Sequence, residues 1–349
     1  MRAVLFHEFG ALPEITDVPA PQCPPSGAVI RVRATGLCRS DWHGWMGHDD
    51  GIRLPHVPGH ELAGVIEEVG SEVTKWKAGD RVTVPFVCAC GRCEQCLLGN
   101  QQVCDNQMQP GFTQWGSFAE FVAIAEADTN LVAIPPELDF VAAAALGCRF
   151  ATAYRAVMTQ GRVQHGEWVA VHGCGGVGLS AIMIAVAAGA KVVAVDVSPQ
   201  ALALAADLGA EVVLGTGGLV GVDPVVGKIR EMTGGGAHLS LDAFGSAATC
   251  ENSIRSLRKR GRHVQVGLML GDQAITPVPM DLVIANELEI RGSHGMAGHE
   301  YPAMLAKIAS GEVDPRILVG RTIVLPEASE ALATMDVGAH PGMTVIVLP

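Results

Sequence analysis

The sequence predicts an α/β protein with two domains, one built mainly from β-strands and one built around a doubly wound parallel sheet. Short β-rich runs separated by turns fill the first third of the chain, and strands alternate with helices after Glu167. The composition is glycine-rich and 49% hydrophobic but only 5% aromatic, which favours an α/β protein over an all-β sandwich. At 349 residues, the chain is long enough to give each domain its own core.

The strand-rich part begins at the N-terminus, and turn residues separate its elements. Residues 139–146 have the small side chains of a closely packed helix. The strands expected here are residues 3–6, 28–33, 62–69, 81–84 and 118–122.

The second part alternates strand and helix, which is typical of crossover units in a parallel sheet. The expected strands are residues 168–172, 191–196, 211–214, 238–242, 262–267 and 288–291. The expected helices between them are residues 176–188, 199–208, 225–232 and 249–256. Beyond these, a helix at 301–309 and strands at 321–325 and 344–348 are expected to rejoin the first domain.

Charge and cysteine content exclude several classes of function. The net charge is −12, and the longest basic run is residues 258–260, which argues against nucleic acid as a partner. The N-terminus lacks the apolar core of a signal peptide, so we expect a cytoplasmic protein whose ten cysteines bind metal or stay reduced. The uncharged run between Glu167 and Lys191 could span a membrane by length, but clustered glycines divide it into a buried strand and helix.

Residues 38–43 combine a thiol, a cation, a hydroxyl, a carboxylate and an imidazole, and His60 and Glu61 follow shortly. Alone, a cysteine is most often a small buried hydrophobe, and a lone histidine is usually structural. Together, Cys38 and His60 suggest zinc, which binds thiolate and imidazole and keeps one position open in catalytic sites. Spacing does not choose the third ligand among the remaining thiols, which include Cys148, Cys174 and Cys250.

Four further cysteines have the spacing C-x2-C-x2-C-x7-C. Four thiolates can complete a tetrahedral zinc shell, and Gly91 and Gly99 allow the loop to fold tightly. An iron–sulfur cluster is the alternative, ranked lower because the loop lies in a strand-rich domain without a second cluster motif. Cys88 is expected to be a non-ligand, and the predicted ligands of this structural zinc are Cys90, Cys93, Cys96 and Cys104.

Residues 173–178 form a G-x-G-x-x-G motif that follows an expected strand and begins an expected helix. The next expected strand ends at Asp196, which is the acidic residue that this motif requires. Gly173 allows the tight turn, Gly175 lets backbone amides approach a pyrophosphate, and Gly178 lets the helix pack on the sheet. Asp196 would accept hydrogen bonds from ribose hydroxyls and repel a 2′-phosphate, so we predict NAD over NADP. The alternative is that Asp196 only caps the next helix.

Over essentially its whole length, the chain resembles the zinc-dependent medium-chain alcohol dehydrogenases. The matching motifs are residues 38–43, 59–61, the four-cysteine loop, residues 147–148, the glycine turn and Asp196. The resemblance implies a groES-like catalytic domain at residues 1–149 and 292–349. It also implies a Rossmann NAD-binding domain at residues 150–291.

The resemblance further implies roles for individual residues. Cys38, His60 and Cys148 would hold the catalytic zinc, and Asp41 would orient the histidine. The implied catalytic residues are Ser40 and His43, as a proton relay through the nicotinamide ribose, and Glu61, as the acid beside the metal. The implied cofactor contacts are Arg39, Gly173, Gly175, Gly176, Val177, Gly178, Asp196 and Val266, and the implied substrate-pocket residues are Trp45 and Phe86.

The implied reaction is reversible oxidation of a small alcohol, held by zinc as its alkoxide, by hydride transfer to NAD, giving an aldehyde or ketone. Two zinc ions per chain and a homotetramer, or alternatively a homodimer, are expected. A polyol or threonine dehydrogenase and a non-catalytic zinc- and nucleotide-binding protein are the alternatives. Two departures from the family stand out, Met343-Thr344 where a Gly-Arg pair is usual and His294 near the expected nicotinamide site.

Overall fold

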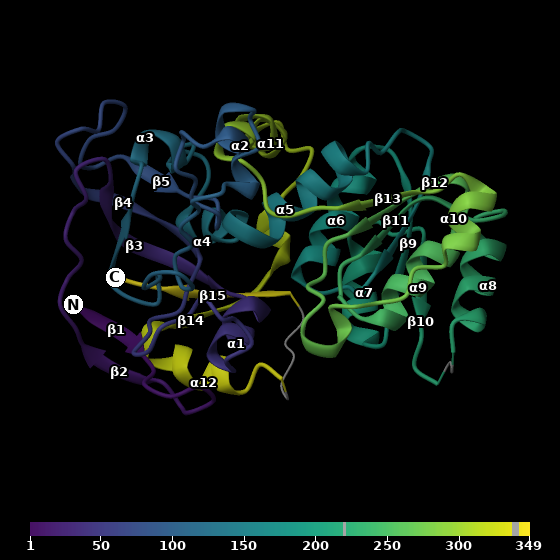
Figure 1. Ribbon diagram of the computed structural model, residues 1–349, viewed down its shortest axis with the longest axis horizontal. Helices are drawn as coiled ribbons and strands as arrows, with labels where there is room; N and C mark the ends of the chain where they lie inside the picture. The colour runs from purple at the N-terminus through teal and green to yellow at the C-terminus, as the bar shows by residue number, and fades with distance from the viewer. Residues whose placement is uncertain (219–220, 337–341) are drawn as a thin grey trace. The chain divides into compact units, whose positions relative to one another are not determined.

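The structure is a computed structural model that describes residues 1–218, 221–336 and 342–349 (Figure 1). The chain divides into two compact units. Unit 1 comprises Met1–Ala151 and Gly295–Pro349, and unit 2 comprises Thr152–His294. Both chain ends therefore belong to unit 1, and unit 2 is one continuous segment.

Unit 1 is organised around a seven-stranded sheet in which the long strand β3 contacts three others. The order is β14-β15-β3-β4-β5-β7, and β6 also pairs with β3. A separate two-stranded sheet is formed by β1 (Arg2–Leu5) and β2 (Glu14–Asp17). The strands of the larger sheet are β3 (Ala28–Leu37), β4 (Glu61–Val69), β5 (Arg81–Thr83), β6 (Phe121–Ile124), β7 (Val132–Ala133), β14 (Val319–Val324) and β15 (Met343–Val347).

The C-terminal strands complete this sheet. β15 pairs antiparallel with β3 and parallel with β14, so the end of the chain lies beside its first long strand. The shared core includes the fully buried side chains of Phe6, Ile30, Leu62, Ile66 and Phe118. The helices of the unit are α1 (Arg39–Trp45), α2 (Glu94–Leu97), α3 (Ala127–Asn130), α4 (Phe140–Ala144), α11 (Tyr301–Ala309) and α12 (Ala328–Ala333), and α5 (Ala151–Tyr154) begins at the last residue before unit 2.

Unit 2 is a six-stranded sheet in the order β10-β9-β8-β11-β12-β13, with every neighbouring pair parallel. Numbered within the unit, this is the order 3-2-1-4-5-6 of a doubly wound dinucleotide-binding sheet. The strands are β8 (Trp168–His172), β9 (Lys191–Asp196), β10 (Val212–Gly215), β11 (Ala237–Asp242), β12 (Leu257–Gln265) and β13 (Glu289–Gly292).

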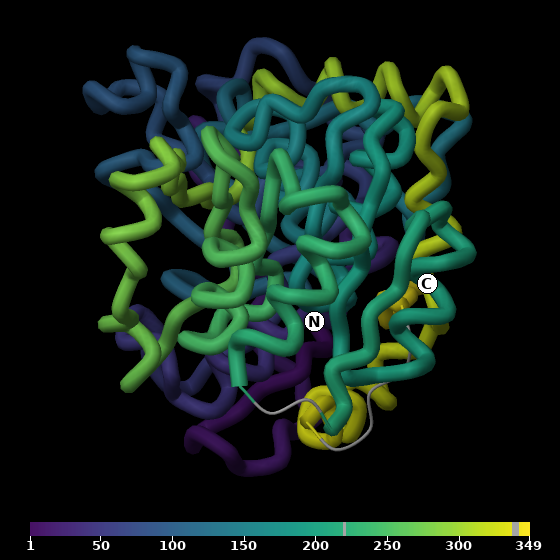
Figure 2. The backbone as a smooth tube through the Cα atoms, turned by 90° about the vertical axis from the view of Figure 1, so that its right-hand side faces the viewer, coloured from purple at the N-terminus to yellow at the C-terminus, as the bar shows by residue number. Residues whose placement is uncertain are grey.

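The helices of unit 2 cover this sheet, and Figure 2 traces the unit from teal into green. α6 and α7 contact β8, β9 and β10, whereas α9 contacts β8, β11 and β12, and α10 contacts β12. Because parallel crossovers are right-handed, reversing the strand order at β8 places these two pairs on opposite faces. The helices are α6 (Gly176–Ala187), α7 (Pro199–Asp207), α8 (Asp223–Met232), α9 (Ala247–Arg255) and α10 (Met280–Asn286).

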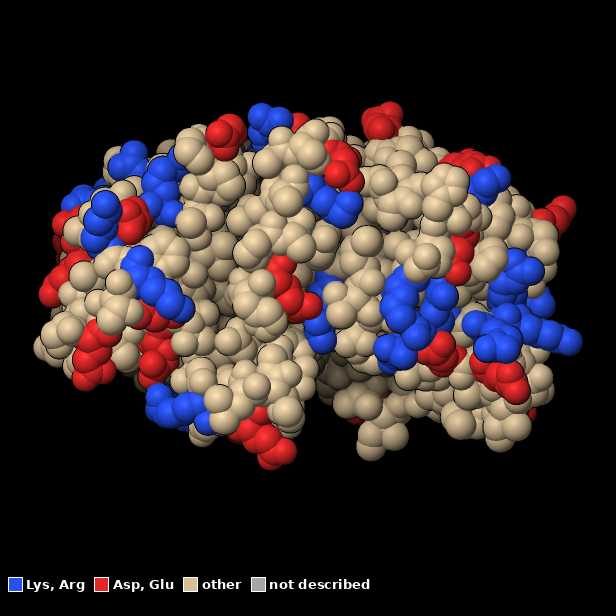
Figure 3. Space-filling view, turned by 90° about the horizontal axis from the view of Figure 1, so that it is seen from above, with Lys and Arg blue, Asp and Glu red and all other residues tan. Residues whose placement is uncertain are grey.

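The uncharged run that is long enough for a membrane span forms β8, the glycine turn and α6. Most of α6 is buried in the unit, which explains why it is apolar on all sides. Among the helices that the structure describes, none combines the length and the apolar character needed to cross a bilayer. On the face shown in Figure 3, basic side chains are interspersed with acidic ones.

Several elements differ from the sequence expectation, including β2, β7 and α12, which were not expected. β12 begins at Leu257, five residues before the expected start. Arg260 within it takes a left-handed φ of 62°, and the pairing of β12 with β11 continues on both sides of this irregularity. α10 is unexpected, since seven residues give too short a periodic pattern. α4 ends at Ala144, and Leu146–Phe150 forms a π-helical turn that carries Cys148.

Candidate active site

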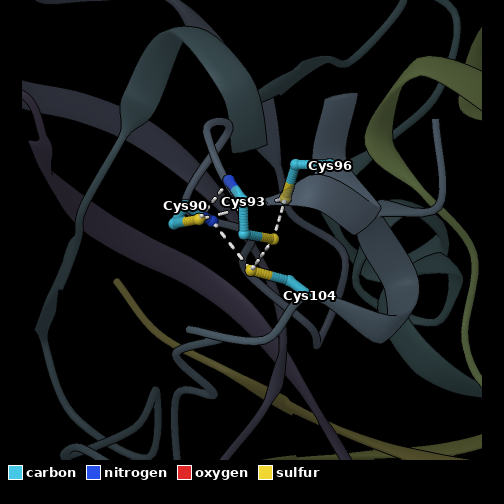
Figure 4. Close-up of side chains that lie close together, drawn as sticks. All are labelled: Cys90, Cys93, Cys96 and Cys104. Atoms are coloured by element: carbon cyan, nitrogen blue, oxygen red, sulfur yellow. Dashed lines mark hydrogen bonds between the residues drawn. The ribbon is translucent and has the colours of Figure 1, made fainter. Parts of the chain in front are cut away.

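The four-cysteine loop brings its thiols together as the spacing predicts (Figure 4). The Sγ atoms of Cys90, Cys93, Cys96 and Cys104 all lie within 4.8 Å of one another. Cys93 Sγ is 3.4 Å from Cys96 Sγ and 3.7 Å from Cys104 Sγ. These separations are far longer than a disulfide bond of about 2.05 Å. They are close to the ~3.8 Å edge of a tetrahedron with Zn–S bonds of ~2.3 Å, so the loop fits zinc.

Backbone amides prepare this loop for thiolates. The Cys90 amide donates to Cys104 Sγ at 3.3 Å, the Asn106 amide donates to the same sulfur at 3.3 Å, and the Cys93 amide donates to Cys90 Sγ at 3.4 Å. The Arg92 and Cys93 amides lower the pKa of the Cys90 thiol to about 6. Donors of this kind stabilise negative sulfur, which is the form that binds zinc.

A second group forms from residues distant in sequence. Ligand atoms of Cys38, His60, Glu61 and Cys148 also lie within 4.8 Å of one another. Cys38 follows β3 as the N-cap of α1, and His60 directly precedes β4. The antiparallel register that pairs Gly36 with Glu61 sets these two segments side by side, and the π-helical turn supplies Cys148. Cys174 and Cys250, the other thiols considered for the third position, are not in this group.

Asp41 fixes the orientation of His60. Its Oδ1 accepts from His60 Nδ1 at 2.8 Å and from the Gly59 amide at 3.1 Å, and its Oδ2 accepts from the Cys38 amide at 2.8 Å. With Nδ1 donating, the lone pair of His60 Nε2 is left free, and this buried atom has no hydrogen-bond partner among the described residues. Carboxylate-oriented histidines are typical metal ligands.

Electrostatics in the group favour a thiolate at Cys38. A hydrogen bond from the Cys148 thiol lowers the pKa of Cys38 well below its usual value, against the opposing effect of burial, and His60 assists. Burial alone would lower the pKa of His60, but the Asp41 carboxylate reverses this effect and raises it. A thiolate, a second thiol and an imidazole oriented by Asp41 together form a donor set that zinc prefers.

Glu61 is fully buried and paired with Arg149, a residue that sequence reasoning missed. The Arg149 amide donates to Glu61 Oε1 at 2.9 Å, and the guanidinium Nε lies 3.0 Å from both carboxylate oxygens. A side chain at Gly36 would lie 2.0 Å from Glu61 Oε2, so only glycine fits opposite this pair. The sequence does contain a signal for this pair, because Arg149 is a lone cation in the apolar segment around Cys148. A buried cation requires a partner of opposite charge.

The predicted relay residues lie on α1. Ser40 Oγ is 3.9 Å from Cys38 Sγ, which places the hydroxyl beside the second group. His43 is half-buried, and its Nδ1 is 3.0 Å from Nδ1 of the exposed His48. Arg39, expected at the pyrophosphate, pairs with Asp336 at 2.8 Å and lies 4.3 Å over the Trp42 ring.

The two expected pocket aromatics have different surroundings. Phe86 stands edge-on to His60, with ring centroids 6.2 Å apart. Trp45 is a core residue, 6% exposed, and its indole N–H donates to the Ala11 carbonyl. Phe112, which sequence reasoning did not single out, lies closer to the His60 ring at 5.2 Å.

In unit 2, the glycine turn has the backbone that a pyrophosphate requires. Gly173 has a left-handed φ of 93°, and a side chain at Gly178 would lie 1.8 Å from the Gly173 carbonyl oxygen. Beside Gly175 there is open space, and α6 begins at Gly176 with Val177 half-buried in its first turn. The turn therefore fits a dinucleotide, with phosphates at the N-terminus of a twelve-residue helix.

Asp196 ends β9 beside this turn, and Val266 directly follows the end of β12. Asp196 accepts from the Cys174 amide at 2.6 Å and from the Ser198 amide at 2.8 Å, so it orders the glycine turn as well as the start of α7. Ser198 itself caps α7. The Val266 amide donates to the Asp242 carbonyl at 3.0 Å. Of the two departures noted above, Thr344 lies within β15 and accepts from Arg321 Nε, and His294 is exposed.

Comparison with known proteins agrees with these observations. Residues 24–136 match the family described as alcohol dehydrogenase GroES-like domain, and residues 176–310 match that described as zinc-binding dehydrogenase. An alcohol dehydrogenase of Geobacillus stearothermophilus is 34% identical over 100% of this chain and 99% of its own length. An NAD-dependent alcohol dehydrogenase of Sulfurisphaera tokodaii is 33% identical over 99% and 100%. The solved alcohol dehydrogenase of Thermus sp. ATN1 superposes with a TM-score of 0.91 at 32% identity, covering both chains fully.

The fold and the two ligand groups define a zinc-dependent dehydrogenase with a GroES-like domain and a Rossmann domain, as the sequence predicted. The chain belongs to the zinc-dependent medium-chain alcohol dehydrogenases. It is therefore an oxidoreductase of the class that acts on CH–OH groups.

Proposed function

We propose that this chain oxidises small alcohols to aldehydes or ketones with NAD, reversibly, at the group formed by Cys38, His60 and Cys148. The observation that carries this proposal is the group of His60 and two thiols, in which the buried His60 Nε2 has no hydrogen-bond partner among the described residues, with the Ser40 hydroxyl alongside. Zinc, when bound, supplies Lewis acidity that makes an alcohol hydroxyl more acidic, and NAD supplies the hydride acceptor.

The residues of this chain have distinct tasks in the proposed reaction. Cys38, His60 and Cys148 hold the metal, and Asp41 keeps the His60 tautomer that leaves Nε2 available. Ser40 Oγ takes the alcohol proton, and His43 carries the proton toward solvent. Phe86 and Phe112, beside the His60 ring, give this side of the site an apolar wall that favours apolar alcohols.

Glu61 is proposed to tune the site through charge rather than to transfer a proton. Its carboxylate is held on both oxygens by Arg149 and is fully buried. Burial raises the pKa of this carboxyl, and Arg149 opposes the rise. The pairing with Arg149 holds the Glu61 carboxylate at a fixed position beside the metal ligands.

In the nucleotide-binding unit, residues 173–178 would hold the pyrophosphate, and Asp196 would accept from the adenine-side ribose. NAD is favoured over NADP because the carboxylate repels a 2′-phosphate. The relative from Sulfurisphaera tokodaii is named as NAD-dependent, which supports this assignment. Arg39 and Val266 complete the proposed cofactor contacts.

The test follows NADH absorbance with primary, secondary and benzylic alcohols, with sorbitol and threonine as the polyol and amino-acid alternatives. NADP is run beside NAD, and zinc is counted in the same protein. Ser40→Ala should cut turnover by about 10²-fold or more, the contribution typical of general acid–base catalysis, without loss of zinc. Ser71→Ala, at an exposed serine of the same unit, is the matched control. Full activity of Ser40→Ala would refute the relay.

We also propose a homotetramer, with a homodimer as the alternative, in the cytoplasm. The resemblance noted from the sequence motivates this proposal, and light scattering after gel filtration measures the mass directly against the 36.4 kDa chain. A monomer at working concentrations would refute both assemblies.

A further inference from the structure

We propose that His48 accepts the proton that His43 receives and passes it to water, so that the proton path ends on a pair of histidines. The inference rests on the proposed function and extends it to a residue without a role in the site described above. The observation behind it is the 3.0 Å contact between His43 Nδ1 and His48 Nδ1, which is hydrogen-bond distance.

The end of α1 builds this contact. Gly47 takes a left-handed φ of 78°, its amide donates to the Gly44 carbonyl, and the His48 amide donates to the His43 carbonyl at 3.0 Å. These two bonds form a Schellman motif, which folds the second residue past the cap over the last turn of the helix. In this motif, an apolar contact usually joins a residue of the last helical turn to the second residue past the cap. Here these two residues are His43 and His48.

The Trp42 ring packs against the imidazoles of both His43 and His48. It stands edge-on to His43 at 5.1 Å and to His48 at 5.8 Å between centroids. Arg39 covers the same indole at 4.3 Å. The pair is thereby held by the helix cap and by an aromatic neighbour, which favours one mutual orientation.

The surroundings of His43 discourage it from keeping a proton. Burial lowers the pKa of His43, and Arg39 and His48 lower it further, whereas Cys38 and Asp336 act in the opposite direction. His48 is exposed to solvent. Because water reaches the exposed ring directly, a proton that arrives at the half-buried ring can leave through His48.

The transfer balances without any added reagent. An N–H bond forms at His43 Nε2 as the proton arrives, the N–H bond at His43 Nδ1 breaks, and an N–H bond forms at His48 Nδ1. The His48 cation then loses its Nε2 proton to water. Between turnovers, both rings regain their starting tautomers by exchange with solvent.

The first test uses the metal-loaded enzyme with ¹⁵N-labelled histidine and measures both rings by NMR across a pH series. In wild type, the Nδ1 signals of His43 and His48 should shift together. In His48→Asn, which keeps a hydrogen-bonding group but no base, His43 should titrate alone and at higher pH. An unchanged His43 titration in His48→Asn would overturn the proposal. This readout does not depend on turnover.

The second test measures the pH profile of alcohol oxidation. His48→Ala should lower kcat by about tenfold, less than the ~10²-fold of a full acid–base group because His43 remains. The acid limb should move to higher pH, and added imidazole should restore the rate. His165→Asn, at an exposed histidine of unit 2, should behave as wild type.

The outcomes separate the two proposals. If wild type oxidises alcohols and Ser40→Ala is inactive, but His48→Ala keeps the wild-type rate and pH profile, the role of His48 is refuted and the relay stands. If wild type oxidises no alcohol, the proposed function fails, whereas the coupled titration of the two histidines still tests their contact.

Discussion

The two sulfur-containing groups of unit 1 differ in how they are built. The four-cysteine group comes from one loop, and backbone amides of that loop donate to its sulfurs. The group of Cys38, His60 and Cys148 comes from segments far apart in sequence and is surrounded by buried charges, including Asp41, Glu61 and Arg149. The first group closes a tetrahedron from the chain itself, whereas the second includes a buried imidazole nitrogen without a partner among the described residues.

This difference is the one expected between a structural metal site and a reactive one. Amide donors and four thiolates satisfy a metal completely and leave no position for a substrate. Two thiols and an oriented imidazole leave a fourth position, with a hydroxyl and a carboxylate nearby. The following predictions test whether the two groups divide the tasks of stability and catalysis in this way.

The largest effect is expected from Cys38→Ala. Loss of a thiolate from the second group should abolish measurable turnover and lower the zinc content from about two ions per chain to about one. Mass spectrometric metal analysis and NADH absorbance check both. Retention of both zinc ions would contradict the assignment of Cys38 as a ligand.

Cys96→Ala should act on stability instead. Structural zinc contributes roughly 10 kcal/mol or more of binding free energy in small metal-folded peptides, so loss of this ion should lower the thermal unfolding midpoint markedly. At low temperature, we expect the turnover of the folded variant, measured per zinc ion bound at the group of Cys38, His60 and Cys148, to stay near that of wild type. If Cys96→Ala abolished activity while the fold and the other zinc persisted, the division between the two groups would be wrong.

Glu61→Gln tests the buried charges that distinguish the second group. The substitution leaves the Arg149 cation without its partner, which should reduce the free energy of unfolding by about 3–5 kcal/mol. Urea denaturation measures this change. The double variant Glu61→Gln/Arg149→Met should regain part of the loss, and strict additivity of the two substitutions would argue against the pair.

The smallest effect is expected from Cys88→Ala. Cys88 is 1% exposed and near the four-cysteine loop, but it belongs to neither ligand group. Burial raises the pKa of its thiol to about 12. Its replacement should cost ~1 kcal/mol of stability and leave zinc content and turnover unchanged. A lower zinc count would show that the loop had been assigned one wrong cysteine.

Much of the architecture was predictable because its signals are local. The edges of β8 and β9 and the start of α6 match the expected ranges, since glycine turns and β-branched runs mark them directly. The fold class was predicted correctly and is confirmed by the sheet order and the family matches. Boundaries were less accurate at β12, where a left-handed arginine interrupts the pattern, and α10 was too short to detect.

The amino-acid sequence by itself determined the four-cysteine group and the glycine turn, because ligands and backbone donors within a few residues of one another meet through local loop geometry. Tertiary structure decided that Cys148, and not Cys174 or Cys250, joins Cys38 and His60, and that Arg149 neutralises Glu61. Those contacts depend on the register that sets Gly36 opposite Glu61, and a shift of one residue would turn every side chain of the strand to the other face. Such a register is a property of the whole packed sheet, which the spacing of residues along the chain does not contain.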